Sequence, residues 1–480
     1  MTNRSFLTVA LALALVFMLV ACGSDKKEPE KTDTGDTEAV TDTDPADTDD
    51  TGDTEAITDT DPADTDDTED AEVVPDEDKT DTDTDTGDSA WETKYKKADE
   101  SAEKVSKDVV KANNQLGIEI FKRLAKEEGA KNVMISPLSI AISMAMTANG
   151  AVDEALAEMK EVLGFGEMDL PDVNEQFAQL IASLVEADKD MVFEIADSVW
   201  MDDAFAPGVK EDFISVLEDY YSAALFTEDF ADAATVGKIN SWVSEKTHEK
   251  IDKLVKEIPQ NTVMYLINAV YFKAGWTNPF NKDDTHKGSF TLSDGTFKET
   301  DYMHAGGFDA PELYFNINSE DGYSVVRIPY GRDVFAFYGI VGSGDIEDFI
   351  SDIAENGIDS YFEEMRIISK GYELELPKFK FAYEKSLKDT FNALGLELVF
   401  NGGLENISDV EGLRVDEIFH KTFIEIDEEG TEAAAHTYVD PEAGGNPYGF
   451  FGTRPFVFVI RDDRTGSILF IGKIEDPTAE

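Results

Sequence analysis

Hydrophobic and polar positions divide the chain into a helical half and a strand-rich half. Apolar residues recur at helical spacing in four stretches, residues 98–128, 136–149, 153–163 and 174–186. Strand-like alternation or short apolar runs follow at residues 192–200, 262–272, 323–329, 372–377, 423–426, 455–461 and 467–471. Because helices and strands do not alternate regularly, the pattern predicts an α+β fold in one large domain over residues 91–480.

A run that is apolar except for Thr8 follows Arg4 and covers residues 6–21. It is shorter than the about 20 residues of a membrane span, and its length is typical of a signal-peptide core. The run ends in Leu-Val-Ala-Cys, and Cys22 is the only cysteine of the chain. This ending resembles a bacterial lipobox, whose cysteine carries a lipid. We therefore expect residues 1–22 to be a lipoprotein signal peptide; a plain secretory signal with an incidental cysteine is the alternative.

Residues 23–90 are strongly acidic and contain no Phe, Tyr or Trp. They carry 28 acidic residues against four lysines, a net charge of −24 out of −61 for the whole chain. Residues 34–50 recur as residues 51–67 with one change, Val40 to Ile57. Such a polar segment buries too little apolar surface to offset the conformational entropy that it would lose on folding. We therefore expect a disordered tether that joins a lipidated Cys22 to the folded body.

Alternating carboxylates at residues 81–88, DTDTDTGD, raise the alternative of a calcium loop. A calcium loop of the helix–loop–helix type has Gly at its sixth position, and Gly87 falls one place late. A solvated spacer is the better interpretation. The chain as a whole has 102 acidic and 41 basic side chains, which makes nucleic-acid binding and activation by a polyanion improbable.

The sequence offers little catalytic machinery. It has no G-x-S-x-G elbow, no H-E-x-x-H and no phosphate-binding glycine loop. Its five histidines fall at no metal-ligand spacing, and one cysteine permits neither an intramolecular disulfide nor a thiolate cluster. We therefore expect no metal, no cofactor and no enzymatic activity.

Six segments, in order between about residues 100 and 477, together resemble a serpin. They are NVMISPLS from Asn132, INSWVSEKTHEKIDKL from Ile239, NAVYFKAGWTNPF from Asn268, LPKFKF from Leu376, RPFVFVI from Arg454 and ILFIGK from Ile468. The resemblance implies helices packed on a large central sheet, an exposed reactive-centre loop, and inhibition of serine proteases. In this family the protease cuts the loop, is held as an acyl-enzyme, and is carried along as the loop inserts into the sheet.

The stretch EEGTEAAAHT resembles the hinge of that loop. Its members are Glu428, Gly430, Thr431, Glu432, Ala433, Ala434, Ala435, His436 and Thr437. An inserted strand turns alternate side chains inward, and the inward set implied by the resemblance, Thr431, Ala433, Ala435 and Thr437, is small and uncharged. Pro441 departs from this pattern, because a proline lacks the N–H that an inserted strand uses.

The resemblance to inhibitory members of the family, whose loops have the same spacing between the positions of Gly430 and Pro455, implies a scissile bond between Gly444 and Gly445, after Ala443. Small residues there suggest an elastase-like or subtilisin-like target, and a cysteine protease stays open. Tyr448 and Phe450 are alternative cleavage sites of the chymotrypsin type, displaced from the expected position. Arg454 lies too far toward the anchored strand to be a trypsin-type cleavage site.

The resemblance also implies a polar cluster where the sheet opens, formed by Ser136, Ser139, Asn268 and His420, with Trp276 at the end where the loop enters. We expect a monomer that works outside the cytoplasm, anchored to a membrane (the outer one if there are two). The second hypothesis is a non-inhibitory binding or scaffold lipoprotein of the same fold. The third is a solute-binding lipoprotein, and the order of the strands disfavours it.

Overall fold

The computed structural model describes residues 9–20, 86–307, 310–318, 322–428 and 448–479. The chain divides into two compact units, Met1–Gly23 with Gly87–Glu480, and Ser24–Thr86. The strands and helices below belong to the first unit, apart from Thr86 at the start of α1. The acidic tether expected over residues 23–90 lies outside the described residues up to residue 85, and its last five residues, 86–90, are not a tether but the first turn of helix α1. The described part contains no helix that is long and apolar enough to cross a membrane.

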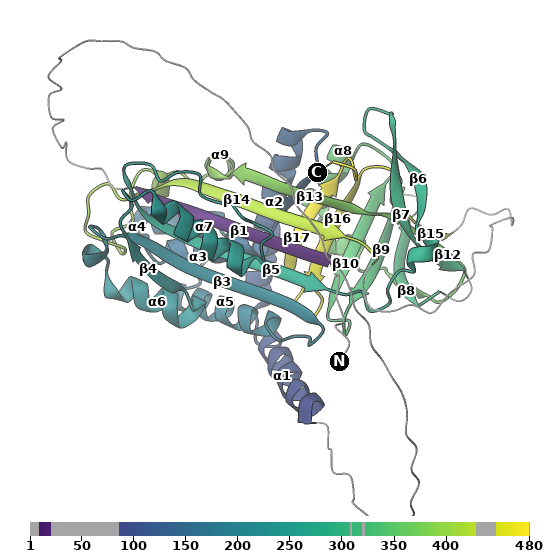
Figure 1. Cartoon of the computed structure of the whole chain (residues 1–480), viewed down its shortest axis with the longest axis horizontal. Coiled ribbons are helices and arrows are strands. Elements are labelled where there is room, and N and C mark those ends of the chain that lie inside the picture. Colours follow the sequence, from purple (N-terminus) through teal and green to yellow (C-terminus); the bar gives the residue numbers. More distant parts are fainter. Residues whose placement is uncertain (1–8, 21–85, 308–309, 319–321, 429–447, 480) are drawn as a thin grey trace, which may run out of the picture. The chain divides into compact units, whose positions relative to one another are not determined.

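A six-stranded sheet forms the centre of this unit (Figure 1). Its spatial order is β13 (Phe379–Ser386), β14 (Arg414–Ile426), β1 (Val9–Val20), β5 (Thr262–Ala274), β3 (Met191–Asp202) and β4 (Ala224–Glu228). β1 is antiparallel to both of its neighbours, so β5 and β14 run in the same direction on either side of it.

Two further sheets complete the β structure. The seven-stranded sheet runs β11 (Arg366–Ile368), β8 (Leu313–Asn318), β9 (Tyr323–Tyr330), β10 (Phe335–Gly342), β16 (Phe456–Asp462), β17 (Ile468–Ile474) and β2 (Val133–Ile135). The four-stranded sheet runs β15 (Tyr448–Phe451), β12 (Tyr372–Pro377), β7 (Phe297–Gly307) and β6 (His286–Thr291).

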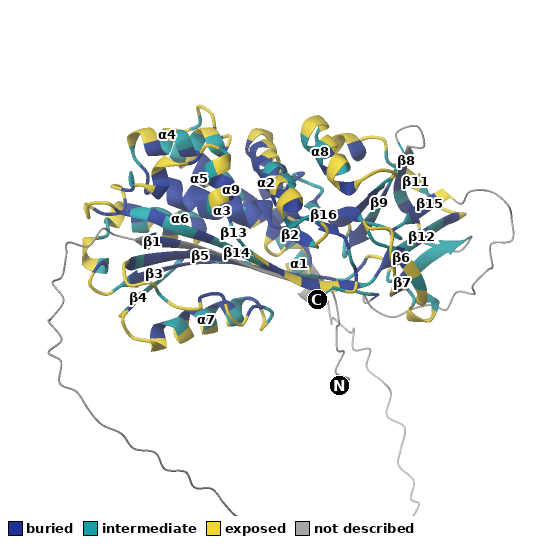
Figure 2. Ribbon diagram, turned by 90° about the horizontal axis from the view of Figure 1, so that it is seen from above, coloured by how far each residue is buried: buried dark blue, intermediate teal, exposed yellow. Residues whose placement is uncertain are grey.

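Helices cover both faces of the six-stranded sheet (Figure 2). The helices of the described residues are α1 (Thr86–Ala102), α2 (Lys107–Glu128), α3 (Pro137–Ala148), α4 (Asp153–Val162), α5 (Leu170–Leu184), α6 (Glu211–Tyr221), α7 (Ala234–Lys246), α8 (Ile346–Asn356) and α9 (Lys388–Ala393). Figure 2 shows α7 on one face, and α3, α5 and α6 on the other. Accordingly there are two apolar clusters: a large one that includes α3, and a smaller one in which Ile239 and Val243 of α7 pack near Tyr265 of β5.

The expected α+β architecture is confirmed, with one local correction. A single helix over residues 98–128 is wrong, because α1 ends at Ala102 and α2 begins at Lys107. Ser106 between them has an extended backbone, and its hydroxyl accepts the N–H of Asp108 at 3.2 Å. A serine that caps a new helix stops the preceding one from continuing through it.

The apolar segment near the start adopts a conformation that its sequence alone did not indicate. Residues Val9–Val20 form β1, in the middle of the six-stranded sheet. Leu19 is fully buried in the large cluster, and its neighbour Met18 is buried in the smaller one. A strand that is covered on both faces is apolar throughout, so the same run of residues suits a central strand and a signal-peptide core.

Candidate functional site

The candidate site is the place between β5 and β14, which we call the central strand position. β1 occupies it, pairing with β5 from Val9 to Val20 and with β14 from Ala10 to Val20. Leu15 lies opposite Asn268 of β5 and opposite His420 of β14. One extended strand therefore pairs with the backbone of both neighbouring strands along the edges that face each other.

A chain of polar side chains links the two sides of this position. The Nε2 atom of His420 accepts the backbone N–H of Ser136 at 3.3 Å, and the Ser136 hydroxyl accepts the N–H of Ser139 at 3.3 Å. The Ser139 hydroxyl donates to Oδ1 of Asn268. The Asn268 amide in turn donates to Oδ1 of Asp197 at 2.9 Å. The structure thus brings together the four residues of the expected polar cluster and adds Asp197 from β3.

Burial shifts the pKa of two groups in this hydrogen-bonded chain in the direction that favours the neutral form. Burial raises the pKa of Asp197 to about 7, although the bond from Asn268 acts in the opposite direction. Burial lowers the pKa of His420 to about 3. Oδ2 of Asp197 and Nδ1 of His420 have no hydrogen-bond partner in the described part of the chain. Both shifts have the same cause, because a buried unpaired charge is strongly disfavoured.

Sequence reasoning missed Asp197, although a signal was present. Residues 193 and 199 of the alternating segment are apolar, and residue 197 lies on the same face of the strand. Phe193 and Val199 are buried in the large cluster, and Asp197 is buried beside them. The signal for Asp197 is therefore an acidic residue at an inward-facing position of a predicted strand.

Glu428, at the base of the expected hinge, lies just beyond the end of β14 and is buried. Its two carboxylate oxygens accept bonds from the Thr285 hydroxyl at 2.7 Å and from the Lys378 ammonium at 2.6 Å. Burial alone would raise the pKa of Glu428, but these two donors outweigh burial and lower it. The sequence did not identify either partner, because both come from distant segments.

Trp276 closes the end of β5 next to this hinge. Its indole N–H donates to the backbone carbonyl of Asp427 at 2.9 Å. Its ring stacks on Tyr330, with ring centroids 4.5 Å apart, and meets Phe280 and Phe337 edge-on. The position predicted for Trp276 and the base of the hinge are therefore joined by a direct bond.

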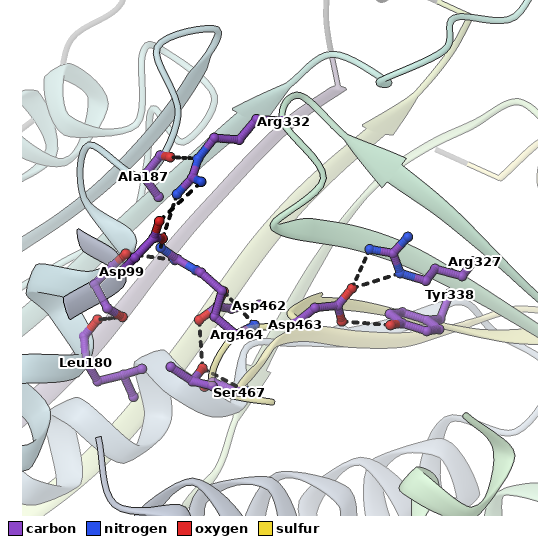
Figure 3. A network of polar contacts seen from close by, with 12 residues as sticks. Asp99, Leu180, Ala187, Arg327, Arg332, Tyr338, Asp462, Asp463, Arg464 and Ser467 are labelled. Atoms are coloured by element: carbon purple, nitrogen blue, oxygen red, sulfur yellow. Dashed lines mark hydrogen bonds and ion pairs between the residues drawn. The ribbon is translucent and has the colours of Figure 1, made fainter. Parts of the chain in front are cut away.

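A salt-bridge network fastens α1 to the turns near this end of the sheet (Figure 3). Asp99 of α1 accepts bonds from Arg332 at 2.7 Å and from Arg464 at 3.0 Å. Arg332 follows Gly331, whose N–H donates to the carbonyl of Gly275 at 2.9 Å. Gly275, which this turn contacts, directly precedes Trp276 in the chain.

The expected reactive loop lies outside the described residues. This applies to Gly430, Thr431, Glu432, Ala433, Ala434, Ala435, His436, Thr437, Pro441, Ala443, Gly444 and Gly445, and likewise to Cys22. The chain is described again from Tyr448, where β15 runs parallel to β12. Phe450 is fully buried, which makes it inaccessible as an alternative cleavage site.

In the described residues, no three His, Cys, Asp or Glu side chains lie so that they could hold a metal ion together. The histidines that meet carboxylates do so in pairs, such as His304 with Glu373 at 2.7 Å. The arrangement around the central strand position is accordingly one of strand pairing and hydrogen bonding, with side chains that can accommodate a strand.

Comparisons with known proteins agree with this architecture. Residues 111–477 match the family model described as Serpin (serine protease inhibitor). Iripin-2 of Ixodes ricinus is 32% identical over 76% of this chain and 93% of its own, and an uncharacterized serpin-like protein of Methanosarcina acetivorans is 30% identical over 78% and 87%. The crystal structure of the thermophilic serpin tengpin in its native state superposes with a TM-score of 0.64, at 28% identity, covering 78% of this chain and 95% of tengpin.

Proposed function

Because this chain belongs to the serpin family, we propose that it is a membrane-anchored inhibitor of extracytoplasmic serine proteases, acting by cleavage of its loop and insertion of that loop into the six-stranded sheet. The observation that carries the proposal is the central strand position. A strand antiparallel to β5 and β14 fits there along its whole length. The expected loop begins where β14 ends, so its first residues start at the edge of that position.

In the processed protein the position has to be empty before the loop can enter it. Removal of residues 1–21 ahead of Cys22 takes away all of β1. The hinge sequence that follows Glu428 is rich in small residues, which suits a strand that must fit between two existing ones. Gly444 and Gly445, with Ala443 before them, favour a protease with a narrow or shallow pocket.

Anchoring through Cys22 would hold the inhibitor at the cell surface, on a tether of residues 23–85 ahead of α1. Such a tether, treated as a flexible coil, reaches tens of ångströms. The inhibitor would then meet proteases that approach the cell, or those that the cell itself secretes. The protease supplies the catalytic nucleophile, and this chain supplies the loop that is cleaved and the sheet that accepts it.

The second candidate is a scaffold lipoprotein of the same fold whose loop is only a substrate. The observation in its favour is Pro441, which has no N–H to donate to a neighbouring strand. Slower or incomplete insertion would give the protease time to complete hydrolysis and leave.

The test mixes residues 23–480 with elastase and, separately, with subtilisin, followed by denaturing gels and mass spectrometry of the released peptide. An SDS-resistant adduct with a peptide that begins at Gly445 is the expected result. Clean cleavage without an adduct would overturn the inhibitory mechanism and favour the scaffold.

A further inference from the structure

We propose that the apolar segment Val9–Val20 is a ligand of the central strand position, so that a chain which retains it is folded but unable to inhibit. This inference rests on the proposed function and adds a second occupant to the same site. The class of ligand is an extended, uncharged, apolar strand, and in the unprocessed chain it is supplied intramolecularly.

The backbone pairing is the first argument. β1 is paired with β5 at every residue from Val9 to Val20, and with β14 from Ala10 onward. Each edge shows a single irregularity, beside Leu19 in both cases. The segment contains no proline, so each of its residues has an N–H to contribute to one of the two ladders.

The composition of the segment is the second argument. At Leu19 and Met18 the strand is covered by the large cluster on one face and by the α7 cluster on the other. Val9–Val20 reads VALALALVFMLV, which has no charged and no polar side chain. The competing loop has Asp440 and Pro441 within the corresponding length. Since burial of apolar surface is favourable and burial of unpaired polar groups is costly, the leader is the better ligand of the two.

Mutual exclusion is the third argument. β5 and β14 each present one edge to the central strand position, and β1 uses both edges. The loop cannot pair with β14 while Ala10–Val20 does so. A protease that cuts the loop of such a chain would therefore complete hydrolysis and dissociate. Lipidation of Cys22 would anchor the protein, and hydrolysis of the bond before Cys22 would release residues 1–21 and vacate the position, so that inhibition begins only after processing.

The first experiment compares the full chain, made by cell-free synthesis without membranes, with residues 23–480. We expect the full chain to unfold at the higher temperature, to be cut by elastase or subtilisin without forming the adduct, and to gain no thermal stability when cut. An adduct formed by the full chain as efficiently as by residues 23–480 would overturn the inference.

Leu19→Arg in the full chain provides the matched variant, because Leu19 is fully buried in β1. We expect it to expel the segment, to restore the adduct and to abolish the extra thermal stability. Leu7→Arg makes the same change outside the strand, and it should leave the full chain inactive. Equal behaviour of the two variants would contradict a role for the pairing.

A peptide of residues 9–20 with added terminal lysines, mixed with residues 23–480, decides the matter if the full chain aggregates. We expect the peptide to raise the melting temperature and to reduce adduct formation, and a version with Ala14→Pro to do neither. No change in melting temperature would overturn the inference. Because the thermal shift does not require inhibition, this readout also separates the inference from a failure of the proposed function.

Discussion

The indole N–H of Trp276 donates to the carbonyl of Asp427 at 2.9 Å, and this bond ties the end of β5 to the last residue before Glu428. β5 and β14, which flank the central strand position, are therefore joined at one end by the Trp276 side chain, in addition to their pairing with the strand that lies between them. Opening at this end requires the bond to break or the tryptophan to follow.

Trp276→Phe keeps an aromatic ring against Tyr330 but loses this bond. We expect the free energy of unfolding to fall by about 1–3 kcal/mol, from one buried hydrogen bond and reduced packing. When a protease cleaves the loop, the fraction of protein that ends as the covalent adduct, compared with the fraction released as cleaved product, should also change. Trp200→Phe is the matched control, because Trp200 donates to Ser198 at 3.0 Å in the α7 face, far along the sheet from the hinge. The control should lose stability without altering the fraction that ends as adduct.

Glu428→Gln weakens the buried pair with Lys378 at the base of the hinge. We expect a loss of about 1–3 kcal/mol in chemical denaturation, because the ammonium loses its charged partner. The lowered pKa of Glu428 adds a pH effect: its contribution is present above the unfolded pKa near 4.5 and is lost as the pH falls through the lower folded pKa.

Glu425→Gln provides the comparison for that variant. Glu425 pairs with Lys250 at 3.4 Å and Lys380 at 3.2 Å, and its side chain is more exposed than that of Glu428. Pairs of this kind contribute little, so we expect a loss of under about 1 kcal/mol. A larger loss for Glu425→Gln than for Glu428→Gln would contradict the importance of the buried pair.

Asp197 and His420 should give the protein opposite pH dependences. Between pH 3 and 6.5 the unfolded chain binds a proton at His420 that the folded chain does not, so this group lowers stability as the pH falls. Between pH 3.8 and 7 the folded chain holds a proton on Asp197 that the unfolded chain releases, so this group lowers stability as the pH rises. In the wild-type protein the two effects largely cancel between about pH 4 and 6.5.

Single substitutions should uncover each slope. In Asp197→Asn the free energy of unfolding should decrease by about 2 kcal/mol, relative to the wild type, from pH 7 to pH 5. In His420→Asn it should increase by about 2 kcal/mol over the same interval. Denaturant titrations at the two pH values measure both, and parallel pH profiles for the two variants would contradict burial as the cause.

Thr431→Arg tests insertion of the loop. By resemblance to the family, Thr431 points into the sheet and Glu432 points out of it. Arginine at the inward position would bury an unpaired charge, so the adduct should disappear while cleavage of the loop continues. Glu432→Arg places the same side chain one residue further on, and most of the adduct should persist. An adduct retained by Thr431→Arg would contradict the insertion step.

The sequence predicts the elements that local patterns specify. β12 (Tyr372–Pro377) has the expected bounds, and β5 begins at Thr262 as expected, because strand patterns are visible in a short window. Ser136 caps α3 as a serine before a Pro-led helix should. The break at Ser106 was overlooked, because apolar spacing continues across it.

What the sequence could not predict depends on pairing between distant segments. Lys378 and Thr285 reach Glu428 from positions 50 and 143 residues away. The place of Val9–Val20 in the sheet depends on two edges supplied by residues more than 240 positions later. An apolar run fits several buried environments equally well, so its pattern cannot distinguish a leader core from a central strand.

The arrangement of β5 and β14 on either side of one strand also makes their backbone a reporter of what lies between them. Amide hydrogens on the two facing edges are protected from exchange with solvent only when a strand accepts them. In the fully occupied sheet they should exchange as slowly as those of β3, and in the vacant sheet far faster. Deuterium uptake by β5 and β14 would thus distinguish the vacant protein from one in which a strand, whether the leader or the loop, lies between them, without any protease present.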